Sequence, residues 1–323
     1  MARILITGAT GLIGFHLLKA LSSGDSKLRV LHRKTSDLNI LRGIIFEAAV
    51  GDLSDDEALQ RAVKDCDAVY HLAAHVSMGT ADVEMMQRIN VAGTAALVSA
   101  ASKAGVKRFV NVSSVAAMGI AAQGQADESE VYNHPPGRPY METKRDAEKA
   151  AHANSGLMTM ISVRPSLVVG PGPFRRGMIA TFVRRALRSG LPLAPRGGIN
   201  VVDVEDVVRV LIEAMNSGQD NDRFLATGHN ISTKSLMKTI CKLTQTPGPA
   251  LSVPGWLTLS VSHAMQGWMN LGLPGELPAI HMRLAATVIH YDDSWTRQRL
   301  ELDAPRSLES TLQKRIDWER SQK

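Results

Sequence analysis

Short apolar runs alternate with helical patterns through the first half of the chain. The first run ends at residue 7, and residues 15–21 then place apolar side chains at helical spacing. Further β-type runs occur at residues 28–31, 50–53, 68–74, 108–114 and 158–163, with helical patterns at 55–63 and 83–104. Strands separated by helices predict right-handed crossovers, and therefore a parallel sheet with helices on both faces. Ligands of such sheets bind beyond the carboxyl ends of the strands.

Three glycines at three-residue spacing, Gly8, Gly11 and Gly14, join the first predicted strand to the first helix. This order places backbone N–H groups at a helix N-terminus, where a pyrophosphate can bind. Gly8 permits a tight turn, Gly11 lets the backbone approach the phosphates, and Gly14 lets the helix pack closely on the strand. The spacing alone also fits an ordinary strand–helix turn. At the start of a strand–helix–strand unit, it indicates a dinucleotide site.

Composition excludes several classes of protein. With 323 residues, 44% of them hydrophobic, the chain suits one large domain or two smaller ones. The distant cysteines Cys66 and Cys241 argue against a disulfide framework and a zinc site, so we expect no metal and a reducing, cytoplasmic compartment. The N-terminus enters a strand at once, which leaves no room for a signal peptide. A formal charge of +6 with mixed signs tolerates acidic ligands without indicating nucleic acid.

The clearest candidate chemistry is a tyrosine four residues before a lysine, Tyr140 and Lys144. On a helix these positions share a face, so the hydroxyl and the ammonium can serve one site. A nearby cation stabilises a phenolate and lowers the phenol pKa from about 10 toward the working range. Ser114 ends the fifth predicted strand, where it can hydrogen-bond the same substrate oxygen. Such a pair alone is typical of a solvated helix face, but the glycine turn and the serine favour catalysis.

Six short motifs follow one another along the chain. They are Thr7-Gly8-x-x-Gly11-x-x-Gly14, Asp52-Leu53, His71-Leu72-Ala73-Ala74, Asn90-x-x-Gly93-Thr94, Ser113-Ser114 and Tyr140-x-x-x-Lys144. Together they resemble the extended short-chain dehydrogenase/reductase family, which includes the nucleotide-sugar epimerases and dehydratases. The resemblance implies an α/β fold with a Rossmann-like, doubly wound parallel sheet and a smaller C-terminal substrate domain.

The domain boundaries follow from this resemblance. We expect residues 1–170 to form the dinucleotide-binding domain and residues 171–323 the substrate region. Within the latter, residues 201–216 should return to the first domain as a helix and residues 223–228 as a strand. Dimerisation through the helices near 83–104 and 139–153 is the family habit, although some relatives are monomers, so both states stay open.

The family's catalytic roles carry over to the matching residues. The resemblance implies that Tyr140 is the acid–base residue and that Lys144 lowers its pKa and holds the nicotinamide ribose. It also implies that Asn90 supports the lysine. Ser114 would orient the substrate carbonyl, because it has the family's spacing to Gly119.

The resemblance further implies a set of cofactor contacts, in which Asp52 and Leu53 flank the adenine. The residues expected to bind the cofactor are Thr7, Gly8, Thr10, Gly11, Leu12, Ile13, Gly14, His32, Arg33, Lys34, Asp52, Leu53, Leu72, Ala73, Ala74, Tyr140, Lys144, Pro165 and Val168.

The second predicted strand ends in His32, Arg33 and Lys34, which bear on cofactor choice. NAD-preferring folds of this type place a carboxylate there to bind the ribose 2′-hydroxyl. Here the first acid is Asp37, whereas Arg33 can grip a 2′-phosphate with its planar fork and Lys34 adds a second charge. The pattern therefore predicts that NADP is preferred to NAD. The alternative is a solvated basic turn that leaves NAD equally acceptable.

Two positions depart from the nucleotide-sugar enzymes. Leu167 stands where they carry an asparagine for the nucleotide, and Ile199 stands where they carry an arginine for the diphosphate. The segment around Pro165 instead resembles dihydroflavonol reductases, 3β-hydroxysteroid dehydrogenases and hopanoid-associated epimerase-like proteins. The first two groups act on large apolar alcohols or ketones. A neighbouring arginine could replace the missing one; the candidates are Arg175, Arg176, Arg184 and Arg196.

No Asp, Glu, Lys or Arg occurs between Lys242 and Glu276. The stretch contains Trp256, Met265, Trp268 and Met269, while its prolines and glycines argue against a membrane-spanning helix. Three interpretations remain: core packing of a small domain, an apolar pocket lining, and weak attachment to a membrane surface.

These observations favour an NAD(P)-dependent oxidoreductase that interconverts a secondary alcohol and a ketone on a bulky apolar small molecule of steroid, terpenoid or flavonoid type. A nucleotide-sugar epimerase or dehydratase with an internally recycled cofactor is the alternative from the same fold. A cofactor-sensing scaffold with a vestigial site is the alternative from another class, and the intact Ser114, Tyr140 and Lys144 speak against it. His71 and His75 are interpreted as structural.

Overall fold

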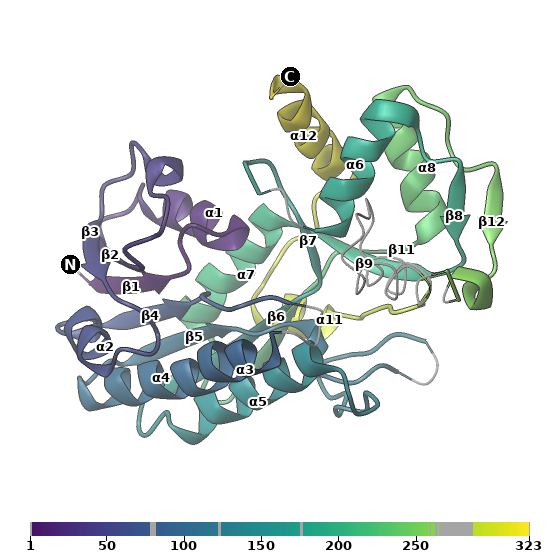
Figure 1. The fold of residues 1–323 in the computed structure, drawn as a ribbon. Helices are drawn as coiled ribbons and strands as arrows, with labels where there is room; N and C mark the ends of the chain where they lie inside the picture. Colours follow the sequence, from purple (N-terminus) through teal and green to yellow (C-terminus); the bar gives the residue numbers. More distant parts are fainter. Residues whose placement is uncertain are drawn as a thin grey trace.

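The computed structural model describes residues 2–77, 82–121, 124–174, 177–258, 260, 261, 264 and 287–322. A seven-stranded parallel sheet in the order β10-β6-β5-β4-β1-β2-β3 forms its centre (Figure 1). The strands are β1 (Arg3–Thr7), β2 (Lys27–His32), β3 (Glu47–Val50), β4 (Ala68–His71), β5 (Arg108–Val112), β6 (Thr159–Pro165) and β10 (Arg223–Ala226). The doubly wound α/β fold is therefore confirmed.

Helices cover both faces of the sheet (Figure 1). One face carries α1 (Leu12–Leu21) and α7 (Val204–Ser217), and the other carries α2 (Asp56–Val63), α3 (Val83–Met86), α4 (Gly93–Lys103) and α5 (Pro139–Ala153). Ile4 and Ile6 of β1 belong to the core under α1 and α7, whereas Leu5 belongs to the core under α2 and α4. A strand buried on both faces has no polar side, which explains the unbroken apolar run Ile4-Leu5-Ile6 of β1.

The strand order reverses between β1 and β4. From β1 the chain proceeds outward through β2 to β3, and it then crosses to β4 and proceeds the other way through β5 and β6. The carboxyl ends of β1 and β4 lie side by side, with Thr7 paired to His71. Such a switch point is where doubly wound sheets bind their ligands. The glycine turn after Thr7 lies there.

A second apolar core holds a small lobe together. This core is built from the helices α6 (Met178–Ser189), α8 (Thr233–Thr244) and α12 (Leu308–Ser321) and the strands β7 (Leu167–Val169), β8 (Leu193–Pro195), β9 (Gly198–Asp203) and β11 (His229–Ser232), and β12 (Leu251–Val253) pairs with β8. The strands form a three-stranded sheet, β11-β9-β7, and a pair, β12-β8. We use the name small lobe for α6, α8, α12, β8 and β12. The division at residue 170 stays a prediction.

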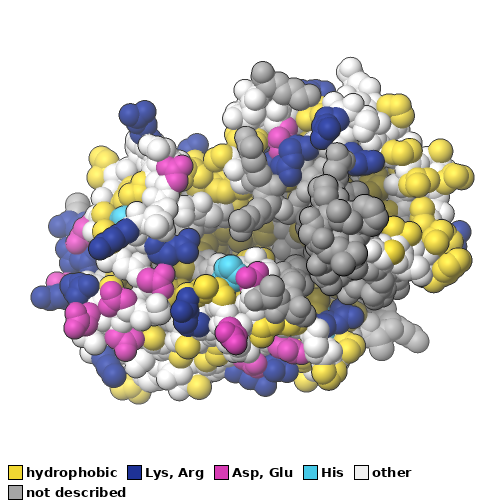
Figure 2. Space-filling model, viewed as in Figure 1, with side chains coloured by type: hydrophobic (Ala, Val, Ile, Leu, Met, Phe, Trp, Pro, Cys, Tyr) yellow, Lys and Arg dark blue, Asp and Glu magenta, His cyan; other side chains and the backbone are white. Residues whose placement is uncertain are grey.

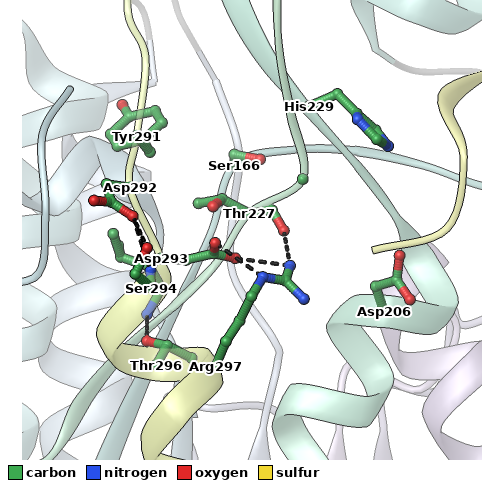
Figure 3. Close-up of polar contacts among 12 residues, drawn as sticks. Ser166, Asp206, Thr227, His229, Tyr291, Asp292, Asp293, Ser294, Thr296 and Arg297 are labelled. Atoms are coloured by element: carbon green, nitrogen blue, oxygen red, sulfur yellow. Dashed lines mark hydrogen bonds and ion pairs between the residues drawn. The ribbon is translucent and has the colours of Figure 1, made fainter. Parts of the chain in front are cut away.

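The C-terminal segment returns to the main sheet. Trp295 of α11 (Ser294–Arg299) stacks on Phe224 of β10, with ring centroids 5.4 Å apart. Arg297 holds the same helix in place by donating to both carboxylate oxygens of Asp293, at 3.0 and 2.9 Å, and to the carbonyl of Thr227 at 3.1 Å (Figure 3). Thr227 directly follows β10. These contacts fix α11 beside the carboxyl end of β10.

Some predicted boundaries are wrong. Residues 201–203, predicted to begin a helix, end β9, because Val201 and Val202 are β-branched and buried there. The helix begins at Val204, where the Asp203 carboxylate caps it by accepting from the backbone N–H of Glu205 at 2.8 Å. Residues 51–53 follow β3 rather than end it. Residues 72–74 and 113–114 lie beyond their strands.

The predicted helix over residues 83–104 is not uniform. It consists of α3, a π-helical segment η2 (Gln87–Ala92) and α4. The 3₁₀ turns are η1 (Asn39–Leu41) and η3 (Val115–Ala117). Met265, Trp268, Met269, Arg175 and Arg176 lie outside the described residues. No helix in the described ranges is both long and apolar enough to cross a bilayer.

Candidate active site

The glycine turn presents an open helix N-terminus. Gly8 has φ +73°, and a Cβ there would lie 2.7 Å from the nitrogen of Ala73, so only glycine fits between β1 and β4. A Cβ at Gly14 would lie 2.2 Å from the Gly8 oxygen, which fixes α1 close to the strand. Gly11 is exposed, and a Cβ there would meet only the Gly8 oxygen, at 3.3 Å. The backbone at Gly11 is thus accessible to a pyrophosphate, as the dinucleotide prediction requires.

Three buried side chains lock this turn to its neighbours. The Thr7 hydroxyl accepts from the backbone N–H groups of Leu72 and Ala73, at 3.2 and 3.1 Å. It therefore donates to Nδ1 of His71, 2.7 Å away, which leaves Nε2 to donate to the hydroxyl of Thr94 at 2.9 Å. Burial and the charge of Lys144 lower the pKa of His71 to about 3, so the ring is neutral. This supports the structural interpretation of His71.

The helix after β4 approaches the site through Gly93. A Cβ at Gly93 would lie 2.8 Å from Cβ of Leu53, so the glycine allows α4 to pack against the loop that follows β3. Asn90, in the π-helical segment, is buried and bonds the backbone of His75 through both amide atoms, at 2.7 and 2.9 Å. Its side chain therefore anchors the loop after β4.

Ser114 and Tyr140 form the centre of the candidate site. Ser114 follows β5 and its Oγ accepts from the backbone N–H of Ala116 at 3.1 Å, which fixes the side chain. Its hydroxyl lies near that of Tyr140, which is in the first turn of α5. Burial raises the pKa of the Tyr140 phenol, and the nearby hydroxyl of Ser114 opposes that shift. The lowering effect expected of Lys144 stays a prediction.

Lys144 lies one helical turn beyond Tyr140 and is buried. Burial lowers the pKa of its ammonium to about 8, and the nearby carboxylate of Glu148 opposes the shift. Lys144 therefore keeps its positive charge at neutral pH. The spacing of Tyr140 and Lys144 on one helix face, predicted from the sequence, is present.

Sequence reasoning missed the buried ion pair behind this lysine. Arg164 of β6 donates to both carboxylate oxygens of Glu148, at 3.1 and 2.6 Å, and Arg223 adds a third bond at 3.2 Å. Burial alone would raise the pKa of Glu148, but the bonds and charge of Arg164 hold it below its usual value. Glu148 is thus a fixed anion one turn beyond Lys144. The sequence did contain one indication of this anion, because an acid four residues after the lysine lies on the same helix face.

A small polar cavity of about 10 Å³ lies on the inner side of the lysine. It is lined by His71, Ala73, Ala74, Asn90, Thr94, Asn111, Val112, Ser113, Lys144 and Ala147. This volume is close to the minimum of about 10–15 Å³ that one water molecule needs.

The basic residues after β2 lie beside the glycine turn, because β2 pairs with β1. Arg33 and Lys34 are exposed, and His32 is half-buried. The carbonyl of His32 accepts from the N–H of Gly51 at 3.0 Å, which brings Asp52 to the same corner. Asp52 in turn accepts from the backbone N–H and hydroxyl of Ser54, at 3.1 and 2.8 Å.

The remaining predicted cofactor residues border the carboxyl ends of the strands. Pro165 ends β6 and is buried, and Val168 of β7 packs against the main core. The half-buried members of the set are Thr10, Leu12, Ile13, Leu72, Ala73 and Ala74. All follow β1 or β4 directly. Contact of each with a cofactor stays a prediction.

The two positions that depart from the sugar enzymes lie in apolar surroundings. Ile199 is buried in the second core, and Leu167 is half-buried and packs against it. The neighbouring Asn200 supplies amide groups, but its Oδ1 accepts from the hydroxyl of Ser166 at 2.6 Å and from the N–H of Gly228 at 2.9 Å. The amide oxygen of Asn200 is thus engaged in hydrogen bonds within the protein.

Comparison with known proteins identifies the family. Residues 4–226 match the model of the NAD dependent epimerase/dehydratase family. The chain belongs to that family, and it is an NAD-dependent enzyme that acts on hydroxyl or carbonyl groups.

Individual relatives span nearly the whole chain. Sterol demethylase protein B of Methylococcus capsulatus is 32% identical over 97% of each chain. A putative dihydroflavonol 4-reductase of Synechocystis sp. is 31% identical over 97% of this chain and 93% of the relative. The structure of UDP-glucose 4-epimerase from Thermotoga maritima with UDP-glucose superposes with a TM-score of 0.80, at 23% identity over 99% of each chain. This structure shows the shared fold.

Proposed function

We propose that this enzyme interconverts a secondary alcohol and a ketone on a bulky apolar substrate. The observation that carries the proposal is the grouping of three side chains: the Ser114 hydroxyl lies near the phenol of Tyr140, and the buried Lys144 lies one helical turn away. This arrangement can give a proton to, or take one from, a single substrate oxygen. The names of the two curated relatives refer to a sterol and a dihydroflavonol, which supports a large, mainly apolar substrate.

Tyr140 is the proton donor in the reductive direction. Its phenol has a raised pKa, so it carries its proton at neutral pH. As the substrate oxygen gains negative charge it takes this proton, and the ammonium of Lys144 stabilises the phenolate that results. The hydroxyl of Ser114 donates to the same oxygen, a stabilisation typically worth about 3 kcal/mol.

A nicotinamide dinucleotide bound at the switch point supplies or accepts the hydride. The residues fit this group, because the open backbone at Gly11 and the small side chains of Ala73 and Ala74 leave room for it. Lys144 would hold the nicotinamide ribose. Arg33 and Lys34 would hold a 2′-phosphate, so we propose that NADP(H) is preferred.

A nucleotide-sugar epimerase or dehydratase is the second candidate, because the matched family is named for epimerases and dehydratases and a UDP-glucose 4-epimerase shares the fold. These enzymes regenerate their cofactor in each cycle, whereas a dehydrogenase or reductase consumes it. Leu167 and Ile199 argue for the first candidate, since neither side chain can hydrogen-bond a nucleotide or a diphosphate.

Ligand binding is expected to separate the two candidates. Steroid or flavonoid ketones should bind the protein–cofactor complex, and UDP- or GDP-sugars should not, as measured by isothermal calorimetry. Leu167→Asn should weaken ketone binding, whereas Leu157→Asn should not, because Leu157 is fully exposed in the loop before β6. Micromolar binding of a sugar nucleotide would contradict the apolar substrate and favour the epimerase.

Cofactor preference is expected to depend on Arg33. A charge-assisted contact with the 2′-phosphate is worth about 1.5–3 kcal/mol, so Arg33→Ala should weaken NADPH binding about ten- to a hundred-fold and leave NADH binding unchanged. Dissociation constants for both cofactors, measured on the wild type and the variant, test this. Arg61→Ala, on the exposed face of α2, is the control. Equal affinities in the wild type, or a ratio that the variant leaves unchanged, would count against NADP.

A further inference from the structure

We propose that the small lobe docks on an anionic lipid surface through an apolar patch bordered by basic residues. The apolar patch comprises Leu193, Leu251, Trp256, Leu257 and Val261. The proposal goes beyond the chemistry of the active site and does not depend on it.

The first part of the apolar patch is a pair of strands. Leu193 of β8 and Leu251 of β12 are register partners and lie side by side, with 52% and 67% of their surfaces exposed. The other residues of the strands are buried or half-buried, including Ala194, which is in the second core. The outer face of the strand pair is therefore apolar. Figure 2 shows hydrophobic side chains gathered at this end of the molecule, over β8 and β12.

The second part continues directly from β12. Residues 255–258, 260 and 261 are helical, and the hydroxyl of Ser260 donates to the carbonyl of Trp256 at 3.0 Å. Leu257 and Val261, one turn apart, are both exposed, and Trp256 has 70% of its surface exposed. A surface helix normally turns polar side chains to water. An exposed helix face with a tryptophan and two aliphatic residues indicates an interaction site instead.

The two chain segments that build most of the small lobe carry charge of one sign. The sequence contains no Asp or Glu between Glu148 and Asp203, and none between Asp222 and Glu276. These two segments supply the small lobe except for α12. Its basic residues there are Arg184, Arg185, Arg188, Arg196, Lys234, Lys238 and Lys242. Lys238 and Lys242 are exposed one turn apart on α8, and Arg196 is exposed at the end of β8.

The acids that face this region come from α12, which packs on α6 and α8. Glu319 already pairs with Arg184 and Arg315, and Asp317 accepts from Gln313. Glu309 lies in the first turn of α12. The exposed cations of α8 and β8 are thus not balanced within their own elements.

Apolar side chains with a tryptophan, flanked by lysine and arginine, are what an interfacial lipid-binding surface requires. Tryptophan favours the headgroup level, aliphatic side chains enter the acyl boundary, and each cation near an anionic surface adds attraction. A second copy of this chain is a poorer occupant, because two such patches brought together would oppose like charges. Charge complementarity therefore favours an anionic bilayer.

Vesicle sedimentation tests the proposal on the whole protein without substrate or cofactor. The wild type should bind vesicles of phosphatidylcholine with phosphatidylglycerol, but not phosphatidylcholine alone, and added salt should weaken binding. The pair Trp256→Ser and Leu257→Ser, and separately the pair Lys238→Glu and Lys242→Glu, should each weaken binding at least about tenfold. Leu157→Ser and Lys103→Glu, substitutions outside the small lobe, should leave it unchanged.

Three outcomes would overturn the proposal. They are absence of binding to anionic vesicles, equal binding to both kinds of vesicle, and binding that the patch variants leave unchanged. Sedimentation velocity without lipid tests a fourth outcome. If the protein self-associates and the pair Trp256→Ser and Leu257→Ser abolishes this, the patch binds a second copy of the chain and not a lipid surface. Because no turnover is measured, failure of the oxidoreductase proposal would leave these results intact.

Discussion

Tyr140→Phe is expected to lower kcat by about 10²–10⁴-fold, the usual contribution of a general acid, while cofactor binding is retained. The substitution removes only the hydroxyl near Ser114 and leaves the ring in its half-buried position on α5. The substrate oxygen then has no proton donor at the end of the helix. Steady-state kinetics in the reductive direction, with cofactor affinity measured separately, give the two readouts.

Tyr132→Phe is the matched control for this substitution. The Tyr132 hydroxyl has no hydrogen-bond partner among the described residues, and the ring lies under the guanidinium of Arg145, 4.6 Å from the centroid. Loss of this hydroxyl should leave kcat unchanged. If Tyr140→Phe kept more than about a tenth of the wild-type kcat, well short of the expected loss, Tyr140 would not be the acid.

The glycine turn gives the second large effect, because its glycines serve different purposes. Gly11→Val is expected to preserve the fold and weaken cofactor binding by about a hundredfold or more, since the new side chain stands where the phosphates must approach. Gly11 has φ −89° and ψ 171°, which valine adopts without strain, and among the described residues only the Gly8 oxygen, at 3.3 Å, lies close to its Cβ position. The melting temperature should therefore stay near that of the wild type.

Gly14→Ala is the contrasting variant. Its Cβ would lie 2.2 Å from the Gly8 oxygen and 2.8 Å from Cα of Ala9, so α1 must shift on its strand. Overpacking of this kind costs about 1–3 kcal/mol of stability, which a thermal melt detects before any ligand is added. If Gly11→Val bound NADPH and NADH as tightly as the wild type, the dinucleotide would not lie on this turn.

The features that could be predicted from the sequence were those carried by local pattern. Short β-type runs separated by helices predicted the parallel sheet, and the four-residue spacing of Tyr140 and Lys144 placed both on one face of α5. The start of α7 was mispredicted because the consecutive apolar residues Val201 and Val202 fit a helix as well as a strand, whereas β9 continues to Asp203. The end of β9 depends on its pairing with β7 and β11, which a short stretch of sequence does not reveal.

The buried polar network could largely not be predicted from the sequence for the same reason. Thr7, His71 and Thr94 are distant in sequence and meet only after β1, β4 and α4 have packed. The bond between Arg164 and Glu148 likewise joins β6 to α5. Exposure of Trp256 and Leu257 depends on which elements cover them, so the sequence left three interpretations of the apolar stretch open. In the structure both side chains are exposed.

Net cofactor turnover with a hydrophobic ketone would show directly whether this enzyme reduces apolar ketones. Purified protein would be mixed with NADPH and, in turn, with a steroid ketone, a flavonoid ketone and UDP-glucose, while nicotinamide absorbance and product formation are followed together. We predict that NADPH is consumed in proportion to the alcohol formed from a ketone, and that this turnover is lost in Tyr140→Phe. Isomerisation of the sugar nucleotide without net consumption of the cofactor, and no reaction with either ketone, would contradict the proposed reduction of an apolar ketone.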